Sequence, residues 1–208
     1  MVSKDEKRPR GRPKQFDEKT AIRKATDLFR RAGYDGVRID QLAKEMGLNK
    51  PSFYRAFGDK EQLFARVAEA YMQEVWTEWQ KGIERATSLD EAIDRTLDIS
   101  ISRFAAAAPS RAGCLVLTTM PAAAGEHDQI QKSLHHFLNA AQTQIAEKLA
   151  TKFPDYFEQS ALSADELASL INSTMHSLAI QARGGATSAE LQKVKNIFLK
   201  SLQPMGIK

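Results

Sequence analysis

Cysteine is almost absent from this sequence, which holds one, Cys114, in 208 residues. A single cysteine excludes a disulfide within the chain and a metal site built from cysteine alone. Long apolar runs are also missing, and no segment approaches the roughly 18 apolar residues that a membrane-spanning helix needs. The first residues are polar and basic, without the apolar stretch of a secretory signal. We therefore expect a soluble, cytoplasmic protein with no membrane partner.

Catalytic and cofactor motifs are lacking as well. The sequence contains no glycine-rich phosphate-binding loop and no nucleophile elbow. Three of its four histidines, His127, His135 and His136, lie near Asp128, but their spacing does not resemble a compact zinc signature. We predict no enzymatic activity, no catalytic residue, no cofactor and no metal site.

Positive charge is concentrated near the N-terminus. Residues 1–60 hold 16 lysines and arginines against 9 aspartates and glutamates, a net charge of +7, whereas the rest of the chain carries −3. A basic head on a mildly acidic body indicates a polyanionic partner for the head. An ordinary solvated surface is the alternative interpretation, and the motifs within the head have to decide between the two.

Helical periodicity runs through the chain from Asp17 onward, and no useful segment alternates with the period of a strand. Asp17 is expected to cap the first helix, and Gly33 to end it. Residues 1–16 contain no apolar period and are predicted to form a flexible basic arm. Apolar stripes continue to the C-terminal region, the last two over residues 167–178 and 191–202. The predicted fold is all-α.

Two short helices lie close together in the basic head. The first is predicted to stop at Gly47, and the second to begin after Asn49 and to end at Phe57. Glycine permits the left-handed backbone that a tight reversal needs, and a helix pair of this kind can place its second helix in the major groove. The pattern predicts a helix-turn-helix between Ile39 and Phe57, with an ordinary helical hairpin as the alternative.

The stretch LAKEMGLNKPSFYRAFGDKEQLF, residues 42–64, resembles the signature of the tetracycline-repressor (TetR) family. The residues that match the pattern preceding it in the family are Ala25, Leu28, Phe29, Gly33, Tyr34 and Gly36. The resemblance covers about residues 15–65. It implies a three-helix DNA-binding head over residues 17–60 and a helical ligand-binding and dimerisation body over residues 61–208.

The resemblance also implies which side chains contact double-stranded DNA. Lys50 and Ser52 are expected at base edges or nearby phosphates, and Tyr54 and Lys60 at phosphates. Pro51 matches a usual contact position, and Arg55 shares the outward face of the second helix. A packing role for the Tyr54 ring and a free surface position for Lys60 are the alternatives.

One part of the head departs from the family pattern. The family usually has serine or threonine at the start of the second helix, where this sequence has Arg38 and Ile39. Because isoleucine cannot cap a helix, we expect Asp40 to do so and Arg38 to take over the phosphate contact.

The basic arm contains an Arg-Gly-Arg-Pro core. Its residues Arg10 and Arg12 resemble the core of an AT-hook, whose guanidinium groups suit the narrow, negative minor groove of A·T-rich DNA. The arm is therefore a second candidate DNA contact, and a solubilising tail is the alternative.

The body is expected to serve assembly and ligand binding. The last two apolar stripes are rich enough to bury both an internal face and a partner, and the resemblance implies a homodimer through them. Residues proposed to line a small-molecule site are Phe104, Met120, Phe137 and Met175. Cys114 is either a buried structural thiol or a redox sensor whose thiolate Arg111 would favour.

The sequence thus predicts a ligand-responsive transcriptional regulator. It is expected to repress transcription by binding a palindromic operator as a dimer, and an unidentified small-molecule effector would alter that binding. The alternative is an architectural, nucleoid-type DNA-binding protein that has no effector.

Overall fold

The computed structural model describes residues 17–105, 113–160 and 162–203. Within these ranges the chain forms ten α-helices and one π-helical turn, η1, and no strand, which confirms the all-α prediction. In chain order the elements are α1 (Glu18–Ala32), α2 (Ile39–Met46), α3 (Lys50–Phe57), α4 (Lys60–Arg85), α5 (Leu89–Ala105), η1 (Leu115–Thr119), α6 (Met120–Ala124), α7 (Asp128–Lys152), α8 (Pro154–Gln159), α9 (Ala164–Arg183) and α10 (Ser188–Leu202). No described helix is long and apolar enough to cross a membrane.

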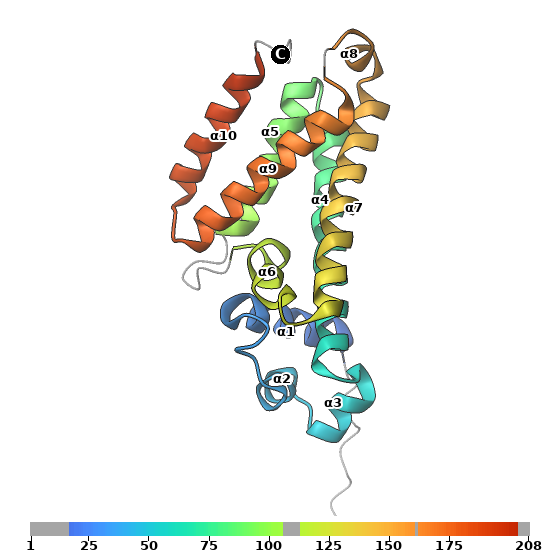
Figure 1. The fold of residues 1–208 in the computed structure, drawn as a ribbon, viewed down its shortest axis with the longest axis vertical. Coiled ribbons are helices and arrows are strands. Elements are labelled where there is room, and N and C mark those ends of the chain that lie inside the picture. The colour runs from blue at the N-terminus through green and yellow to red at the C-terminus, as the bar shows by residue number, and fades with distance from the viewer. Residues whose placement is uncertain (1–16, 106–112, 161, 204–208) are drawn as a thin grey trace, which may run out of the picture.

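The helices form an elongated molecule with α2 and α3 at one end (Figure 1). The long helix α4 runs from this end into the body, where it packs against α5 and α7. Helices α9 and α10 lie toward the opposite end, with α10 packed on α5 and α9. The residues predicted to contact DNA and the helices predicted to form the dimer therefore lie toward opposite ends of the molecule.

Side-chain caps fix the helix boundaries in the head. Asp17 accepts a hydrogen bond from the Lys19 backbone N–H (3.1 Å), and Asp59 accepts one from the Gln62 N–H (2.8 Å). These bonds satisfy backbone donors that the first turn of a helix leaves unpaired. Asp17 was predicted as an N-cap, and this prediction is confirmed.

An aromatic cluster joins the head to α4. Phe29 of α1 and Phe64 of α4 lie edge to face with ring centroids 4.8 Å apart, and Tyr34 lies 5.0 Å from Phe64. All three side chains are buried, and they belong to a core that continues from α1 to α10. The head therefore packs directly on the body rather than being joined to it by a linker.

A buried lysine fastens α10 to α5. Lys195 is 5% exposed, and its Nζ lies 2.7 Å from Asp94 Oδ1 and 2.5 Å from Asp98 Oδ1. Gln192 also donates to Asp98, at 2.8 Å. Burial alone would lower the pKa of Lys195, but the two aspartates outweigh it and hold that pKa above the usual 10.5.

We expect Lys195→Met to lower the free energy of unfolding by about 1–2 kcal/mol at pH 7, measured by urea denaturation. Removing one partner of a fully buried ion pair costs about 3–5 kcal/mol, but water screens the two half-exposed aspartates and reduces that cost. Because folding raises the pKa of Lys195, its contribution is complete below pH 10.5 and is lost as the pH rises through the folded-state value.

The matched control is Lys193→Met, which removes the same charge from an exposed position of α10. This control should change stability by less than about 0.5 kcal/mol. Equal effects of the two substitutions would show that the Lys195 cluster does not stabilise the fold.

Candidate DNA-binding face and body cavity

The turn between α2 and α3 has the geometry of a helix-turn-helix. Gly47 has φ 73°, in the left-handed region that favours glycine, and the Leu48 N–H donates to the Ala43 carbonyl at 2.8 Å. Leu48 is partly buried against the core. The predicted turn, with Gly47 ending the first helix, is therefore confirmed.

The helix α3 has one buried face and one exposed face. Asn49 caps it by accepting from the Ser52 N–H at 2.8 Å, with Pro51 in the first turn, as predicted. Phe53 and Phe57 point inward and are 0% and 3% exposed. The outward side chains are Lys50, Pro51, Ser52, Tyr54 and Arg55, of which Ser52 is half-buried. Tyr54 is 50% exposed, and its ring lies edge to face against Phe53 with centroids 5.7 Å apart, so both a packing role and a DNA contact stay open.

The start of α2 differs from the prediction. Asp40 was expected to be the N-cap, but the helix begins at Ile39 and the N-cap position is held by Arg38. In an ordinary N-cap, the side chain of the cap residue accepts a hydrogen bond from the helix. Here the backbone N–H of the cap residue, Arg38, donates to the side-chain oxygen of Gln41 at 2.9 Å. Glutamine at the third helical position can satisfy that donor without a polar side chain at the cap.

Asp40 instead pairs with cations on the exposed face. Its Oδ1 lies 2.7 Å from Lys50 Nζ, and its Oδ2 lies 4.0 Å from Arg38. The hydrogen bond from Lys50 lowers the pKa of the Asp40 carboxyl, which stays ionised at neutral pH. Both Lys50 and Arg38, predicted DNA contacts, are thus close to a carboxylate in the free protein.

Lys60 lies at the start of α4 and reaches across the head. Its Nζ donates to the backbone oxygens of Tyr34 (3.2 Å) and Val37 (3.3 Å) and lies 4.1 Å from the centre of the Tyr34 ring. An ammonium group has three N–H donors, so one is left for a phosphate. Lys60 is therefore not the free surface lysine of the alternative interpretation. Arg10 and Arg12 lie outside the described residues.

A second contact between head and body involves Arg30 of α1. Its Nη2 donates to the Gly113 carbonyl at 2.6 Å and to the Arg103 carbonyl at 3.2 Å. In return, Arg183 at the end of α9 donates to the Arg30 carbonyl at 2.7 Å. The guanidinium groups of Arg30 and Arg103 both lie over the Tyr71 ring, at 5.8 Å and 5.1 Å from its centre. Nothing in the sequence pattern pointed to this contact, because its partners lie 73 to 153 residues from Arg30.

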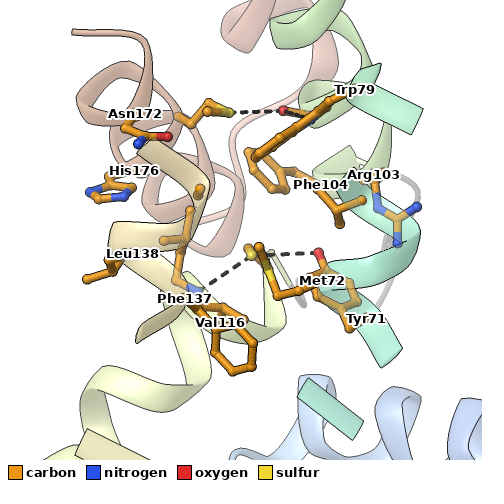
Figure 2. Close-up of a pocket in the computed structure, with 16 residues that line it drawn as sticks. Tyr71, Met72, Trp79, Arg103, Phe104, Val116, Phe137, Leu138, Asn172 and His176 are labelled. Atoms are coloured by element: carbon orange, nitrogen blue, oxygen red, sulfur yellow. Dashed lines mark hydrogen bonds between the residues drawn. The ribbon is translucent and has the colours of Figure 1, made fainter. Parts of the chain in front are cut away.

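The body encloses a small, chiefly apolar cavity of about 40 Å³ between α4, α5, η1, α7 and α9. Figure 2 shows Tyr71, Trp79 and Arg103 on one side of it, and Leu138, Asn172 and His176 on the other. The lining residues are Tyr71, Met72, Val75, Trp79, Ser100, Arg103, Phe104, Cys114, Val116, Leu117, Phe137, Leu138, Ala141, Asn172, Met175 and His176.

Three of the four residues proposed for ligand binding meet at this cavity. Phe104, Phe137 and Met175 line it, from α5, α7 and α9 respectively. Met120, the fourth, is 0% exposed and is not part of the lining, because it lies at the start of α6 within the core. Met120 is therefore placed in the core and not at the cavity wall.

Cys114 is a buried lining residue. Its Sγ lies 3.6 Å from the Tyr71 hydroxyl, which donates to it, and the Leu117 N–H donates to the same sulfur at 3.5 Å. Burial raises the pKa of the Cys114 thiol, which keeps it protonated and weakly nucleophilic. This environment favours the structural interpretation over the redox sensor. Arg111, expected to favour a thiolate, lies outside the described residues.

Clusters of three or more potential metal ligands are not found among the described residues. His127, one of the histidines considered above, instead contacts the head. Its Nε2 lies 3.1 Å from Asp35 Oδ1, and its ring packs edge to face on Tyr34 at 4.8 Å.

Comparison with known proteins shows which family the head resembles. Residues 21–67, from α1 into α4, match the model of the family "Bacterial regulatory proteins, tetR family". The HTH-type transcriptional repressor BdcR of Escherichia coli (strain K12) is 28% identical over 192 residues, which cover 92% of this chain and 91% of BdcR. Residues 21–67 therefore carry a TetR-type domain, and the chain is similar to a repressor along most of its length.

Further TetR-type proteins match over nearly the whole chain. The HTH-type transcriptional repressor ComR of Escherichia coli (strain K12) is 25% identical over 199 residues, 93% of this chain and 92% of ComR. A cysteine mutant of the TetR family transcriptional regulator CifR, solved in complex with 26bp double-strand operator DNA, has a TM-score of 0.78 at 25% identity, covering 91% of this chain and 98% of CifR. A TetR regulator from Chloroflexus aurantiacus J-10-FL shares the fold, with a TM-score of 0.74 at 22% identity over 89% of this chain and 93% of its own.

The TetR-type domain and the similarity to BdcR and ComR support a DNA-binding transcriptional regulator of the helix-turn-helix type. The exposed face of α3 is the surface predicted to contact DNA.

Proposed function

We propose that the protein is an effector-responsive repressor that binds a palindromic operator as a homodimer. The observation that carries this proposal is the exposed polar face of α3, in a chain that is similar along most of its length to CifR, whose structure contains operator DNA. The relatives BdcR and ComR are both repressors, which supports repression here.

The DNA contacts are proposed from the exposed groups of the head. Lys50 and Ser52 begin α3, where side chains of a recognition helix reach base edges, and Arg55 follows on the same helix. The Tyr54 hydroxyl and the remaining donor of Lys60 are proposed to contact phosphates, with Arg38 and Pro51 at the margin of the contact. We propose that the chain is divided into a basic arm over residues 1–16, a DNA-binding head over residues 17–60 and a body over residues 61–208.

The basic arm is proposed to extend the contact into the minor groove through Arg10 and Arg12. Deleting residues 1–14 should weaken operator binding and flatten its salt dependence, because each lost phosphate contact lowers the slope of log K against log salt by about 0.9. Fluorescence anisotropy at several salt concentrations measures this slope. An unchanged slope would assign the arm to solubility instead.

The dimer is proposed to form through α9 and α10. Four large hydrophobic side chains are exposed in the described part of the chain, and three of them, Leu170, Ile180 and Ile197, lie on these two helices. Ile180 and Ile197 are 62% and 68% exposed, which is costly for a surface facing water. The fourth exposed side chain is Tyr54, on the proposed DNA face.

We expect Ile180→Glu combined with Ile197→Glu to convert a particle of two chains into single chains. In a twofold interface each new carboxylate is buried in both subunits, where like charges and lost water both oppose association. Light scattering at micromolar concentration gives the number of chains per particle. A matched control introduces two glutamates at Gln131 and Thr143, exposed on α7. A double Ile variant that stays paired would place the dimer interface elsewhere.

The effector is proposed to act through the contact between the cavity and α1. Arg103 and Cys114 line the cavity, and Arg30 of α1 binds the carbonyls of Arg103 and of Gly113, the residue before Cys114. A ligand that displaces these lining residues would weaken the hold on Arg30 and shift α1, and with it the spacing of the two heads. The ligand changes operator affinity only to the extent that it prefers one of the two arrangements.

The proposal is tested by binding to the DNA upstream of the protein's own coding sequence against a scrambled duplex, at physiological salt. A repressor of this kind should prefer the first by at least about 10³-fold. A smaller ratio would instead support the architectural alternative, in which basic charge binds DNA with little regard to sequence.

A further inference from the structure

Two polar side chains on the α9 wall of the cavity have no hydrogen-bond partner in the part of the chain that the structure describes. Asn172 and His176 lie one helical turn apart and both line the cavity (Figure 2). Asn172 is only 8% exposed. Within the described residues, neither side chain forms a hydrogen bond with the protein. Buried polar groups in proteins are nearly always hydrogen-bonded, so an amide left without a partner at a cavity wall indicates a partner from outside the chain.

Most of the other polar groups at the cavity are already paired, although Arg103 Nε is buried without a hydrogen-bond partner among the described residues. The Trp79 indole N–H donates to Ser100 Oγ at 3.1 Å, and the Ser100 hydroxyl lies 2.9 Å from the Thr96 carbonyl, its acceptor. The Tyr71 hydroxyl donates to Cys114. A hydrogen-bond-accepting ligand group would therefore find free partners on α9, and a further free donor at Arg103 Nε of α5.

The cavity offers no free charge. Arg103 carries the charge on the lining, but it is paired with Glu78 at 2.8 Å and Glu74 at 3.6 Å, neither of which faces the cavity. Burial lowers the pKa of His176 and raises those of Tyr71 and Cys114, so all three are neutral at pH 7. No aspartate or glutamate is found among the described residues that line the cavity. An ammonium group would be buried without a counter-ion, and a carboxylate would meet an Arg103 whose charge Glu74 and Glu78 already balance.

The lining also has to yield before a ligand can enter. An apolar cavity of about 150 Å³ admits benzene, whereas this one measures about 40 Å³. Met72 and Met175 form part of the wall, and methionine side chains repack readily. Binding would therefore be linked to a rearrangement of the body.

We propose that the cavity binds an uncharged, largely hydrocarbon molecule with one hydrogen-bond-accepting oxygen, such as a ketone. The oxygen accepts from the Asn172 amide, with the neutral His176 ring as the second polar neighbour. This inference rests on the proposed effector role of the body, and it names the chemical class of the effector.

The test uses four probes of similar size: acetophenone, ethylbenzene, 1-phenylethylammonium and benzoate. Each is titrated into the full-length chain by calorimetry at pH 7. Acetophenone should bind most tightly, and the two ions should bind at least about tenfold more weakly than acetophenone. In Asn172→Leu, acetophenone should lose about tenfold in affinity, while ethylbenzene changes by less than about threefold. Asn139→Leu, at an exposed position of α7, is the matched control.

A second variant keeps the proposal testable if Asn172→Leu does not fold. Asn172→Asp puts a carboxylate at the same wall and should reverse the preference, so that 1-phenylethylammonium binds more tightly than acetophenone. The proposal is overturned by equal binding of ethylbenzene and acetophenone, by an ion binding best, by indifference of acetophenone to both variants, or by no binding of any probe at millimolar concentration.

A separate measurement tests the proposed function, namely the affinity of the chain for its operator in the absence of any probe. Specific DNA binding with no preference among the probes would overturn only the ligand class. A chain that binds the probes as expected but shows no preferred DNA sequence would overturn the repressor and keep the cavity.

Discussion

Replacing both Lys50 and Tyr54 with alanine is expected to lower operator affinity by about 10³-fold. A good base contact contributes about 1–3 kcal/mol and a hydrogen bond to a charged phosphate a similar amount, and in a dimer each substitution removes its contact twice. Two contacts worth about 1 kcal/mol each, lost in both heads, amount to about 4 kcal/mol, which corresponds to roughly three orders of magnitude.

The surroundings of Lys50 strengthen this expectation. Asp40 lies 2.7 Å from Lys50 Nζ, so removing the lysine leaves a carboxylate on the face that approaches the phosphates. The Lys50–Asp40 pair is exposed, and its loss should cost the fold less than about 1 kcal/mol. The thermal midpoint should therefore change little while DNA binding falls.

Two further variants separate the contributions to this loss. Tyr54→Phe keeps the ring on Phe53 and removes only the hydroxyl, and should weaken binding about three- to tenfold by anisotropy. Lys81→Ala removes the same charge as Lys50→Ala from an exposed position of the body and should have little effect. If the double alanine variant binds the operator within threefold of the native affinity, α3 does not contact the DNA.

Replacing Phe64 with alanine is expected to lower the free energy of unfolding by about 3–5 kcal/mol. The side chain is 1% exposed, and its ring lies 4.8 Å from Phe29 and 5.0 Å from Tyr34. Alanine would leave a cavity between α1 and α4, at the place where the head is packed on the body. Operator binding should therefore fall together with stability.

Urea denaturation measures the loss, and Phe157→Ala serves as the control. Phe157 is half-buried on the short helix α8, so its truncation should cost much less. Phe64→Leu should recover most of the lost stability, because it fills most of the volume. A cost below about 1 kcal/mol for Phe64→Ala would show that the aromatic cluster does not hold the head.

The head was largely predictable because its determinants are local. Asp17, Asn49 and Asp59 cap helices through bonds to residues two or three positions away, and Gly47 adopts the left-handed turn that its position indicated. Asp40 was the error. At the start of α2 the Gln41 side chain accepts the hydrogen bond of the Arg38 N–H. Asp40 instead forms an ion pair with Lys50, ten residues along the chain.

The body was predictable only as a set of helical stripes. Met120 and Met175 look alike in sequence, yet one lies in the core and the other at the cavity, since burial by helices and burial around a cavity produce the same apolar period. Lys195 reads as a surface lysine because its partners lie about 100 residues earlier. The sequence did not indicate Asn172 and His176 as binding residues, because only the folded structure shows that no other side chain among the described residues hydrogen-bonds with them.

Footprinting of the protein on its operator tests the central claim most directly, namely that two α3 helices read DNA as a symmetric pair. The operator is first selected from random duplexes and then probed with hydroxyl radicals at physiological salt. We predict two protected half-sites of inverted sequence, centred about 34–36 Å or a multiple of that distance apart, and their loss in the Lys50 and Tyr54 double variant. A single protected site, or protection that does not depend on sequence, would contradict the account.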